Sequence, residues 1–285
     1  MALNVLISGA NSGFGLLTTA AFARAGHIVH AGYRDPAKLA ALETLATAGL
    51  EVRPVRLDVT DDASVRAAAG EAATAGPIDV LVNNAGFEVS GPVEHLSDAS
   101  LTRQFETNVL GVVRMVRATV PAMRERGEGL IVNVSSVAGQ IAAPFTGAYS
   151  ASKHAVEALS EALWFELRPF GVRVVLIEPG AFSTSFGDNI IVEPHYGEDS
   201  PYRPVAARFN AAMAAFRSGP AQNPQEVADL ILAAAADPDA KLRHLAGDDA
   251  RMLVPLYRSM EFEAFASVML QRLGLTDLIK APAGA

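Results

Sequence analysis

Seven short runs rich in Val, Ile and Leu, separated by Ala-rich stretches of helical character, constrain the fold of this chain more than any other feature. The runs show little alternation of apolar and polar residues, which indicates strands buried on both faces. Such strands alternating with helices predict an α/β fold with a doubly wound, mainly parallel seven-stranded sheet flanked by helices. The runs are Asn4–Ile7, His27–Tyr33, Val52–Leu57, Val80–Val82, Leu130–Val134, Val172–Ile177 and Leu242–Leu245.

The length of 285 residues suits one large α/β domain, and no repeat or linker interrupts the chain before about Ile177. We therefore expect a single domain over residues 1–285. Four prolines break the stretch 186–224, which indicates a substrate loop or lid. A C-terminal extension follows at 251–285, and its apolar residues could either cover a pocket or form an interface.

One set of apolar residues inside 186–224 has the spacing of a single helix face. Such a stripe either packs against the sheet or covers the substrate. The residues are Val205, Phe209, Met213 and Phe216.

The composition excludes several classes of protein. A net charge of -8 disfavours nucleic-acid binding, which needs clustered Lys and Arg. No apolar stretch reaches the roughly 18 residues of a membrane span, and no secretory leader precedes Val5, so the cytoplasm is expected. The chain has no Cys and only six scattered His, so we expect neither disulfides nor a metal site.

The first predicted strand runs into a glycine-rich turn, Ser8 to Gly15, and then into a helix. Glycines in this context let backbone N–H groups approach a pyrophosphate, and the helix N-terminus favours negative charge. An ordinary strand-to-helix turn would be the alternative. The strand and helix context favours a dinucleotide site in a Rossmann fold.

The end of the second strand predicts which dinucleotide binds. A carboxylate there would repel a 2′-phosphate, but the position is held by neutral Tyr33, followed by Arg34. Arg34 can clamp a phosphate, so we expect NADP(H) rather than NAD(H). Asp35 could instead compensate the charge of Arg34 or contact the ribose.

A second group of residues predicts acid–base chemistry. Tyr149 and Lys153 lie four residues apart in a helical stretch, so their side chains share one face. A cation lowers the pKa of a nearby tyrosine, which then exchanges protons more readily. Ser136 follows the fifth strand, at the edge where such sheets bind ligands, and could polarise a carbonyl oxygen.

Together these elements resemble the classical short-chain dehydrogenase/reductase family. They occur in the family's order: the glycine-rich turn, Asn83-Asn84-Ala85-Gly86, the strand-end Ser136, and Tyr149 with Lys153. The Ser-to-Tyr spacing selects Ser136 over Ser135. The resemblance covers about Leu3 to Thr184. The overall pattern, including Arg243 to Ala250 and the long C-terminal stretch, looks like the hydroxysteroid/retinol-dehydrogenase-like branch.

The resemblance implies four catalytic residues. Tyr149 would be the acid/base, Ser136 would donate a hydrogen bond to the substrate oxygen, and Lys153 would bind the nicotinamide ribose. Asn108 would hold a water that continues the proton relay, although it could instead mark a structural kink.

The resemblance also extends the cofactor site beyond the glycine-rich turn. Asp58 and Val59 would contact adenine, although Asp58 could simply cap a helix. The complete expected set is Gly9, Asn11, Ser12, Gly13, Phe14, Gly15, Arg34, Asp58, Val59, Asn84, Ala85, Gly86, Tyr149, Lys153, Pro179, Gly180, Phe182 and Thr184.

The expected reaction is hydride transfer between nicotinamide and a carbonyl or secondary alcohol. Phe145, Phe182 and Phe186 predict an apolar substrate pocket, while Glu88 could either face that pocket or be solvated. A non-enzymatic NADP sensor and an epimerase or dehydratase of the same family are the alternatives. The family resemblance also leads us to expect a homodimer or homotetramer.

Overall fold

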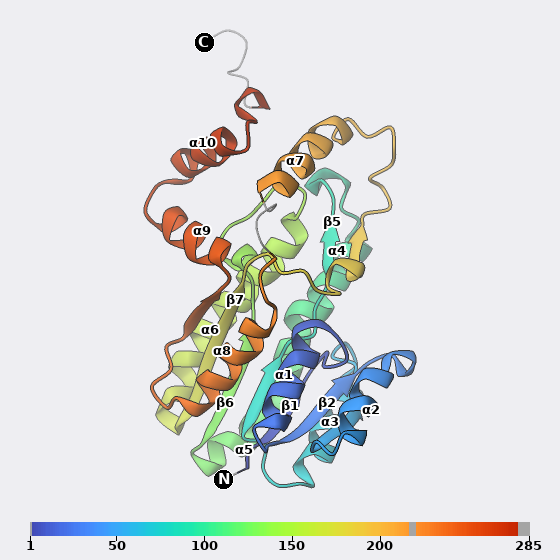
Figure 1. Cartoon of the computed structure of the whole chain (residues 1–285), viewed down its shortest axis with the longest axis vertical. Helices are drawn as coiled ribbons and strands as arrows, with labels where there is room; N and C mark the ends of the chain where they lie inside the picture. Colours follow the sequence, from blue (N-terminus) through green and yellow to red (C-terminus); the bar gives the residue numbers. More distant parts are fainter. Residues whose placement is uncertain (1, 217–220, 279–285) are drawn as a thin grey trace.

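The predicted parallel sheet is present, and the strand order explains where a ligand would bind (Figure 1). The computed structural model describes residues 2–216 and 221–278. All seven strands run parallel, and the order reverses between β1 and β4, which opens a crevice at their carboxyl ends. From one edge to the other the strands are β3 (Val52–Arg56), β2 (Ile28–Tyr33), β1 (Asn4–Ile7), β4 (Val80–Asn83), β6 (Gly129–Val134), β7 (Val172–Pro179) and β9 (Arg243–Ala246).

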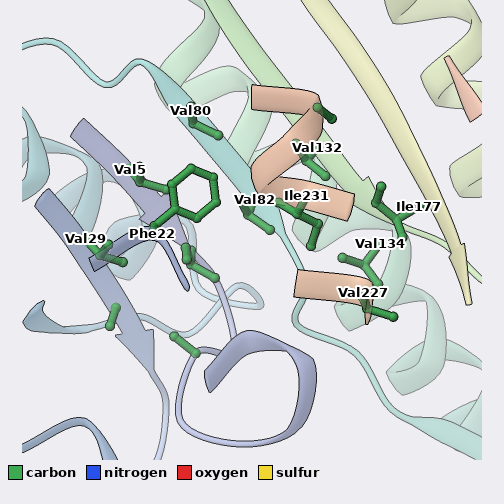
Figure 2. Close-up of a cluster of buried hydrophobic side chains, with 14 of the residues drawn as sticks. Val5, Phe22, Val29, Val80, Val82, Val132, Val134, Ile177, Val227 and Ile231 are labelled. Atoms are coloured by element: carbon green, nitrogen blue, oxygen red, sulfur yellow. The ribbon is translucent and has the colours of Figure 1, made fainter. Parts of the chain in front are cut away.

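Every residue of β1, β4 and β6 is buried, since helices cover both faces of the sheet. On one face Phe22, Val227 and Ile231 pack on the valines of the central strands (Figure 2). On the other face Met115 and Met123 fill the equivalent layer. The first face is covered by α1 (Gly13–Arg24), α2 (Ala40–Thr47) and α8 (Gln225–Ala236), and the second by α3 (Asp62–Ala73), α5 (Gly111–Arg126) and α6 (Gly147–Leu167).

A small parallel sheet was not predicted from the sequence. It pairs β5 (Glu88–Ser90) with β8 (Ile190–Val192), in register from Glu88 opposite Ile190. Each strand has three residues, too few to show a period, and the partners lie about 100 positions apart. This pairing anchors the start of the 186–224 stretch to the loop that follows β4.

The remaining helices gather mainly beyond the carboxyl ends of the strands, where Figure 1 shows α7, α9 and α10 at one end of the molecule. Among the described residues, no helix combines the length and apolar character needed to cross a membrane. These helices are α4 (Asp98–Phe105), α7 (Arg203–Phe216), α9 (Asp248–Arg258) and α10 (Phe262–Arg272). Short 3₁₀ turns lie at Pro36–Lys38, Val93–His95, Val137–Gly139, Arg168–Phe170, Gly187–Asn189 and Thr276–Leu278.

Candidate active site

One cavity of about 1020 Å³ runs along the carboxyl edge of the sheet. Its walls come from the glycine-rich turn, from the ends of β4, β6 and β7, and from α7, α9 and α10. The elements predicted to hold a cofactor and those predicted to hold a substrate therefore face one continuous space.

The glycine-rich turn lies at the cofactor end of this cavity. Gly9 has a φ of +63°, and a Cβ at this position would lie 2.9 Å from the Cα of Ala85. The Asn84 side chain donates hydrogen bonds to the carbonyl oxygens of Ser8 and Gly9, at 3.1 and 2.9 Å. The turn is thus held open against the loop after β4, with the N-terminus of α1 beside it, and this cradle fits a pyrophosphate.

Every predicted cofactor residue except Gly15 lines the cavity. Gly15 lies behind the turn, against the Gly9 carbonyl oxygen. Asp58 does not cap α3, because Asp61 accepts the capping hydrogen bond from Ala63. Instead the Asp58 carboxylate accepts hydrogen bonds from the backbone and side chain of Thr60, at 2.9 and 2.7 Å.

Two cations face the cavity just after β2. Arg34 was expected, and Lys38 was missed because it follows in a short 3₁₀ turn. Among the described residues, neither cation lies within ion-pair distance of a carboxylate. Asp35 accepts a hydrogen bond from the backbone N–H of Ala37 at 3.0 Å and so begins that turn.

Ser136, Tyr149 and Lys153 all line this cavity. Ser136 and Tyr149 share a side-chain hydrogen bond, whereas the buried Oγ of Ser135 contacts no hydrogen-bond partner in the described chain. The Lys153 Nζ donates to the Val134 carbonyl oxygen at 2.8 Å and lies 5.7 Å from the centre of the Tyr149 ring. The N-terminal turns of α6 therefore place both predicted side chains beside the end of β6.

Burial shifts the pKa values of this pair in a way that the sequence did not predict. Desolvation raises the pKa of Tyr149, the hydrogen bond with Ser136 opposes the rise, and the nearby carboxylate of Glu88 adds to it. Desolvation also lowers the pKa of Lys153 to about 8. The lowering of the Tyr149 pKa that was expected from Lys153 is therefore not seen: the group that opposes desolvation is Ser136, and the net shift is upward.

Asn108 lies behind the cavity wall in a π-helical turn, Glu106–Leu110. Its Nδ2 donates to the Phe87 carbonyl oxygen at 3.0 Å and to the Ser152 Oγ at 3.1 Å, and its Oδ1 accepts from the Phe87 N–H at 3.2 Å. The structural kink left open by the sequence is thus present. The same side chain ties the loop after β4 to α6, one residue before Lys153.

The turn after β7 brings Pro179, Gly180, Phe182 and Thr184 to the cavity. Ser136 Oγ lies 3.4 Å from the Pro179 carbonyl oxygen, to which it can donate. The Phe182 ring packs edge-on against Phe14 of the glycine-rich turn, with centroids 5.5 Å apart. This turn therefore bridges the catalytic group and the cofactor end.

The residues that α7 and α10 contribute make one end of the cavity, here called the substrate end, largely apolar, and Glu88 and Arg103 also line the cavity. Phe186 lies against Tyr149, with ring centroids 5.8 Å apart. The apolar residues from the 186–224 stretch and the C-terminal extension that line this end are Phe186, Ile190, Ile191, Phe209, Met213, Leu253, Phe262, Phe265, Ala266, Met269, Leu270 and Leu273.

Phe145 is not brought to this cavity. It adopts a φ of +65°, stacks on Tyr196 and lies tilted against Phe209 instead, at centroid distances of 6.4 and 6.2 Å. The helix stripe that the sequence identified is split, since Phe209 and Met213 face the cavity while Val205 is exposed. The Phe216 side chain and residues 217–220 and 279–285 lie outside the described part of the chain.

Asp249, which lines the cavity from the start of α9, was not predicted from the sequence. It had no recognisable signal, because its neighbour Asp248 looks identical in sequence. In the part of the chain that the structure describes, no three His, Asp or Glu side chains gather as metal ligands would.

Comparison with known proteins agrees with this geometry. The family model described as short chain dehydrogenase matches residues 3–193. A 3-ketodihydrosphingosine reductase from Bacteroides thetaiotaomicron is 40% identical over 199 residues, covering 70% of this chain and 71% of that protein. Human 17-beta-hydroxysteroid dehydrogenase type 1 is 38% identical over 251 residues, covering 84% of this chain and 76% of that protein.

Solved structures show the same fold with nicotinamide cofactors. A short-chain dehydrogenase/reductase from Burkholderia phymatum in complex with NAD superposes with a TM-score of 0.78, at 34% identity and 94% coverage of both chains. Other solved members were determined with NADP or NADPH. With the family match over most of its length, this chain is an oxidoreductase of the short-chain dehydrogenase/reductase family.

Proposed function

We propose that the chain catalyses NADP(H)-dependent reduction of a ketone or aldehyde, and the reverse oxidation of an alcohol, with apolar substrates favoured. The observation that carries the proposal is the meeting of Ser136, Tyr149 and Lys153 in the same cavity as the glycine-rich turn. When bound, the nicotinamide group would supply or accept the hydride.

Each catalytic residue has a distinct task in this proposal. Tyr149 donates a proton to the substrate oxygen in reduction and removes it in oxidation. Ser136 donates a hydrogen bond to the same oxygen and stabilises its developing charge. The Lys153 ammonium donates one N–H to the Val134 carbonyl oxygen, which leaves two N–H donors for the hydroxyls of the nicotinamide ribose.

Asn108 is assigned to the proton path. A Cβ added to Gly86 would lie 3.3 Å from the Asn108 Oδ1 and 3.8 Å from the Lys153 Nζ, so the space beside Gly86 borders both polar atoms. We place the relay water in this space. The water would exchange a proton with Tyr149 by way of Lys153.

The preference for NADP(H) is supported by the two cations, Arg34 and Lys38, at the cofactor end. A 2′-phosphate would meet charge-assisted donors there. The adenosine side is assigned to Asp58 and Val59, and the nicotinamide side to Gly180 and Thr184.

The apolar substrate is supported by the residues that α7 and α10 contribute. Phe209, Met213 and Phe265 line the cavity beyond Tyr149, so we assign 186–224 as a lid and the extension from 251 as part of the pocket, within one domain. The relatives' printed names, a ketodihydrosphingosine reductase and a hydroxysteroid dehydrogenase, point in the same direction. The homo-oligomer and the cytoplasmic location stay predictions of the sequence.

The test is the decay of nicotinamide absorbance with NADPH and with NADH, across a panel of steroid, retinoid, aryl and aliphatic carbonyls. We expect turnover that is selective for NADPH and for apolar carbonyls. Binding of NADPH without turnover of any panel member would favour a cofactor-sensing protein, and a preference for short polyols would contradict the apolar pocket.

A further inference from the structure

The C-terminal extension reaches the cofactor side of the cavity through a single carboxylate. Asp249, in the first turn of α9, accepts a hydrogen bond from the backbone N–H of Ala181 at 2.7 Å. Its other oxygen accepts from Nε2 of Gln222 at 2.8 Å. One side chain thus joins the turn after β7, the segment before α8 and the start of α9.

Gln222 closes this arrangement into a network. Its Nε2 also donates to the carbonyl oxygen of Ala181 at 2.9 Å, and its Oε1 accepts from the backbone N–H of Asp248 at 2.6 Å. Both polar ends of the carboxamide are therefore engaged, and Ala181 is held through its N–H and its C=O at once. We call Asp249, Gln222, Gly180 and Ala181 the Asp249 clamp.

Gly180 shows how closely the clamp is built. A Cβ at this position would lie 2.0 Å from the Oδ1 of Asp249, so any other residue would displace the carboxylate. The Gly180 N–H donates to the carbonyl oxygen of Ala246 at 2.9 Å, which continues the pairing of β7 with β9.

The clamped turn lies between two parts of the proposed active site. On one side Ser136 contacts the Pro179 carbonyl oxygen, and on the other Phe182 packs against Phe14. The residues of the clamp themselves line the cavity at Gly180, Ala181 and Asp249. A shift of this backbone would therefore move the wall between the catalytic group and the glycine-rich turn.

We propose that Asp249 is a positioning residue: through Ala181 and Gln222 it sets the backbone that faces the nicotinamide half of the bound cofactor. The inference rests on the proposed function. It assigns the extension a role on the cofactor side, in addition to the apolar wall that it gives the substrate.

The test compares Asp249→Asn with the matched control Asp248→Asn, whose side chain is 98% exposed. Asn has one acceptor oxygen where the clamp uses two, and its NH₂ group would face a donor. In the protein without nucleotide, we expect the Ala181 amide of D249N to exchange its hydrogen about tenfold faster. D248N should exchange like the wild type.

Ligand binding then separates positioning from general stability. We expect D249N to bind NADPH about tenfold more weakly, because the backbone that faces the nicotinamide half is no longer held in place. Adenosine 2′,5′-bisphosphate, which occupies only the adenine half, should bind as before. The kcat should fall with that affinity, and the thermal unfolding midpoint should stay close to that of D248N.

A double-mutant cycle checks the geometry independently. Gly180→Ala alone should weaken NADPH binding strongly, since the new Cβ would clash with the Asp249 carboxylate. In the Asp249→Ala background the same substitution should cost less, because the obstructing oxygen is gone. Additive effects would contradict the clamp.

The failures are distinguishable. If D249N binds NADPH and the bisphosphate as the wild type does, or binds both more weakly by the same factor, the positioning role is wrong while the proposed function stands. If the wild-type protein binds neither ligand, the proposed function itself is wrong.

Discussion

The two ends of the cavity are built in different ways. The cofactor end is formed mainly by backbone at strand ends: the turn at Gly9, the loop that Asn84 braces, and the turn after β7. The substrate end is formed mainly by side chains on α7 and α10, which lie outside the seven-stranded sheet.

This difference separates chemistry from selectivity. Backbone at a strand end is fixed by the register of the sheet, so few substitutions can move it. Side chains on outlying helices can change without disturbing the core. Variants at the cofactor end should therefore alter catalysis or cofactor affinity, and variants at the substrate end should alter substrate affinity alone.

The largest effect is expected at the junction of the two ends. Tyr149→Phe should lower kcat by about 10² to 10⁴-fold, since the proton donor is lost, while NADPH affinity is kept. Steady-state kinetics and titration with NADPH measure the two quantities. Tyr257→Phe, on α9, is the control and should match the wild type; near-wild-type turnover by Y149F would refute the acid/base role.

At the cofactor end, Gly9→Ala should weaken dinucleotide binding by about 100-fold. The left-handed conformation costs roughly 1 to 2 kcal/mol for a residue with a side chain, and the Cβ would also press on Ala85. Gly26→Ala is the matched control, because Gly26 also has a positive φ, +85°, with no atom within 4 Å of its Cβ position. Equal losses of NADPH affinity in both variants would show that the contact with Ala85 is irrelevant.

Removal of the Arg34 charge should affect the binding of the two cofactors differently. Arg34→Ala should weaken NADPH by about 10 to 100-fold and leave NADH nearly unchanged, since a charge-assisted hydrogen bond contributes about 1.5 to 3 kcal/mol. Calorimetric titration with both cofactors measures this. Arg56→Ala, at the exposed end of β3, provides the control; equal losses of NADPH and NADH affinity would move the phosphate contact elsewhere.

At the substrate end, Met269→Ala should raise the KM for an apolar carbonyl by about 3 to 10-fold, through the loss of apolar contact. The Kd for NADPH should not change. Met252→Ala, on the exposed side of α9, is the control. A change in NADPH affinity in M269A would break the division between the two ends.

The smallest effect is expected at a buried carboxylate pair that does not line the cavity. Buried Glu178 and Glu157 share Arg243 and Gln140, and burial with the neighbouring Glu157 carboxylate raises the pKa of Glu178 to about 7. The unfolded chain releases this proton near pH 4.5, so the group lowers stability as the pH rises from about 4.5 to 7. The difference in unfolding midpoint between Glu178→Gln and the wild type should therefore be more favourable to the variant at pH 8 than at pH 5, by about 2 to 4 °C. Glu166→Gln, at an exposed position of α6, is the control; an E178Q effect on the midpoint that is the same at both pH values would contradict the shift.

Much of the fold and of the cofactor end could be predicted, because both follow local rules. Buried strands leave uninterrupted apolar runs, and Gly9, Ser136, Tyr149 and Lys153 occur in segments whose spacing is readable along the chain. The seven-stranded sheet and the family are confirmed. The roles of the individual residues stay predictions that the variants above test.

The rest depends on contacts between distant segments. Lys38, Asp249 and the pairing of β5 with β8 have no local signal, and Phe145 turns away because its positive φ directs it to Tyr196. The pKa of Tyr149 was also beyond sequence reasoning, since spacing predicts a nearby cation but not the degree of burial.

The packing of α8 against α1 has a consequence for the order in which the molecule forms. Phe22 is buried beneath Val227 and Ile231, about 200 positions later in the chain (Figure 2). During synthesis, all four predicted catalytic residues therefore leave the ribosome before the helix that completes this core. Until then the first face of the sheet exposes its valines, so folding should be slow and most prone to aggregation at this stage.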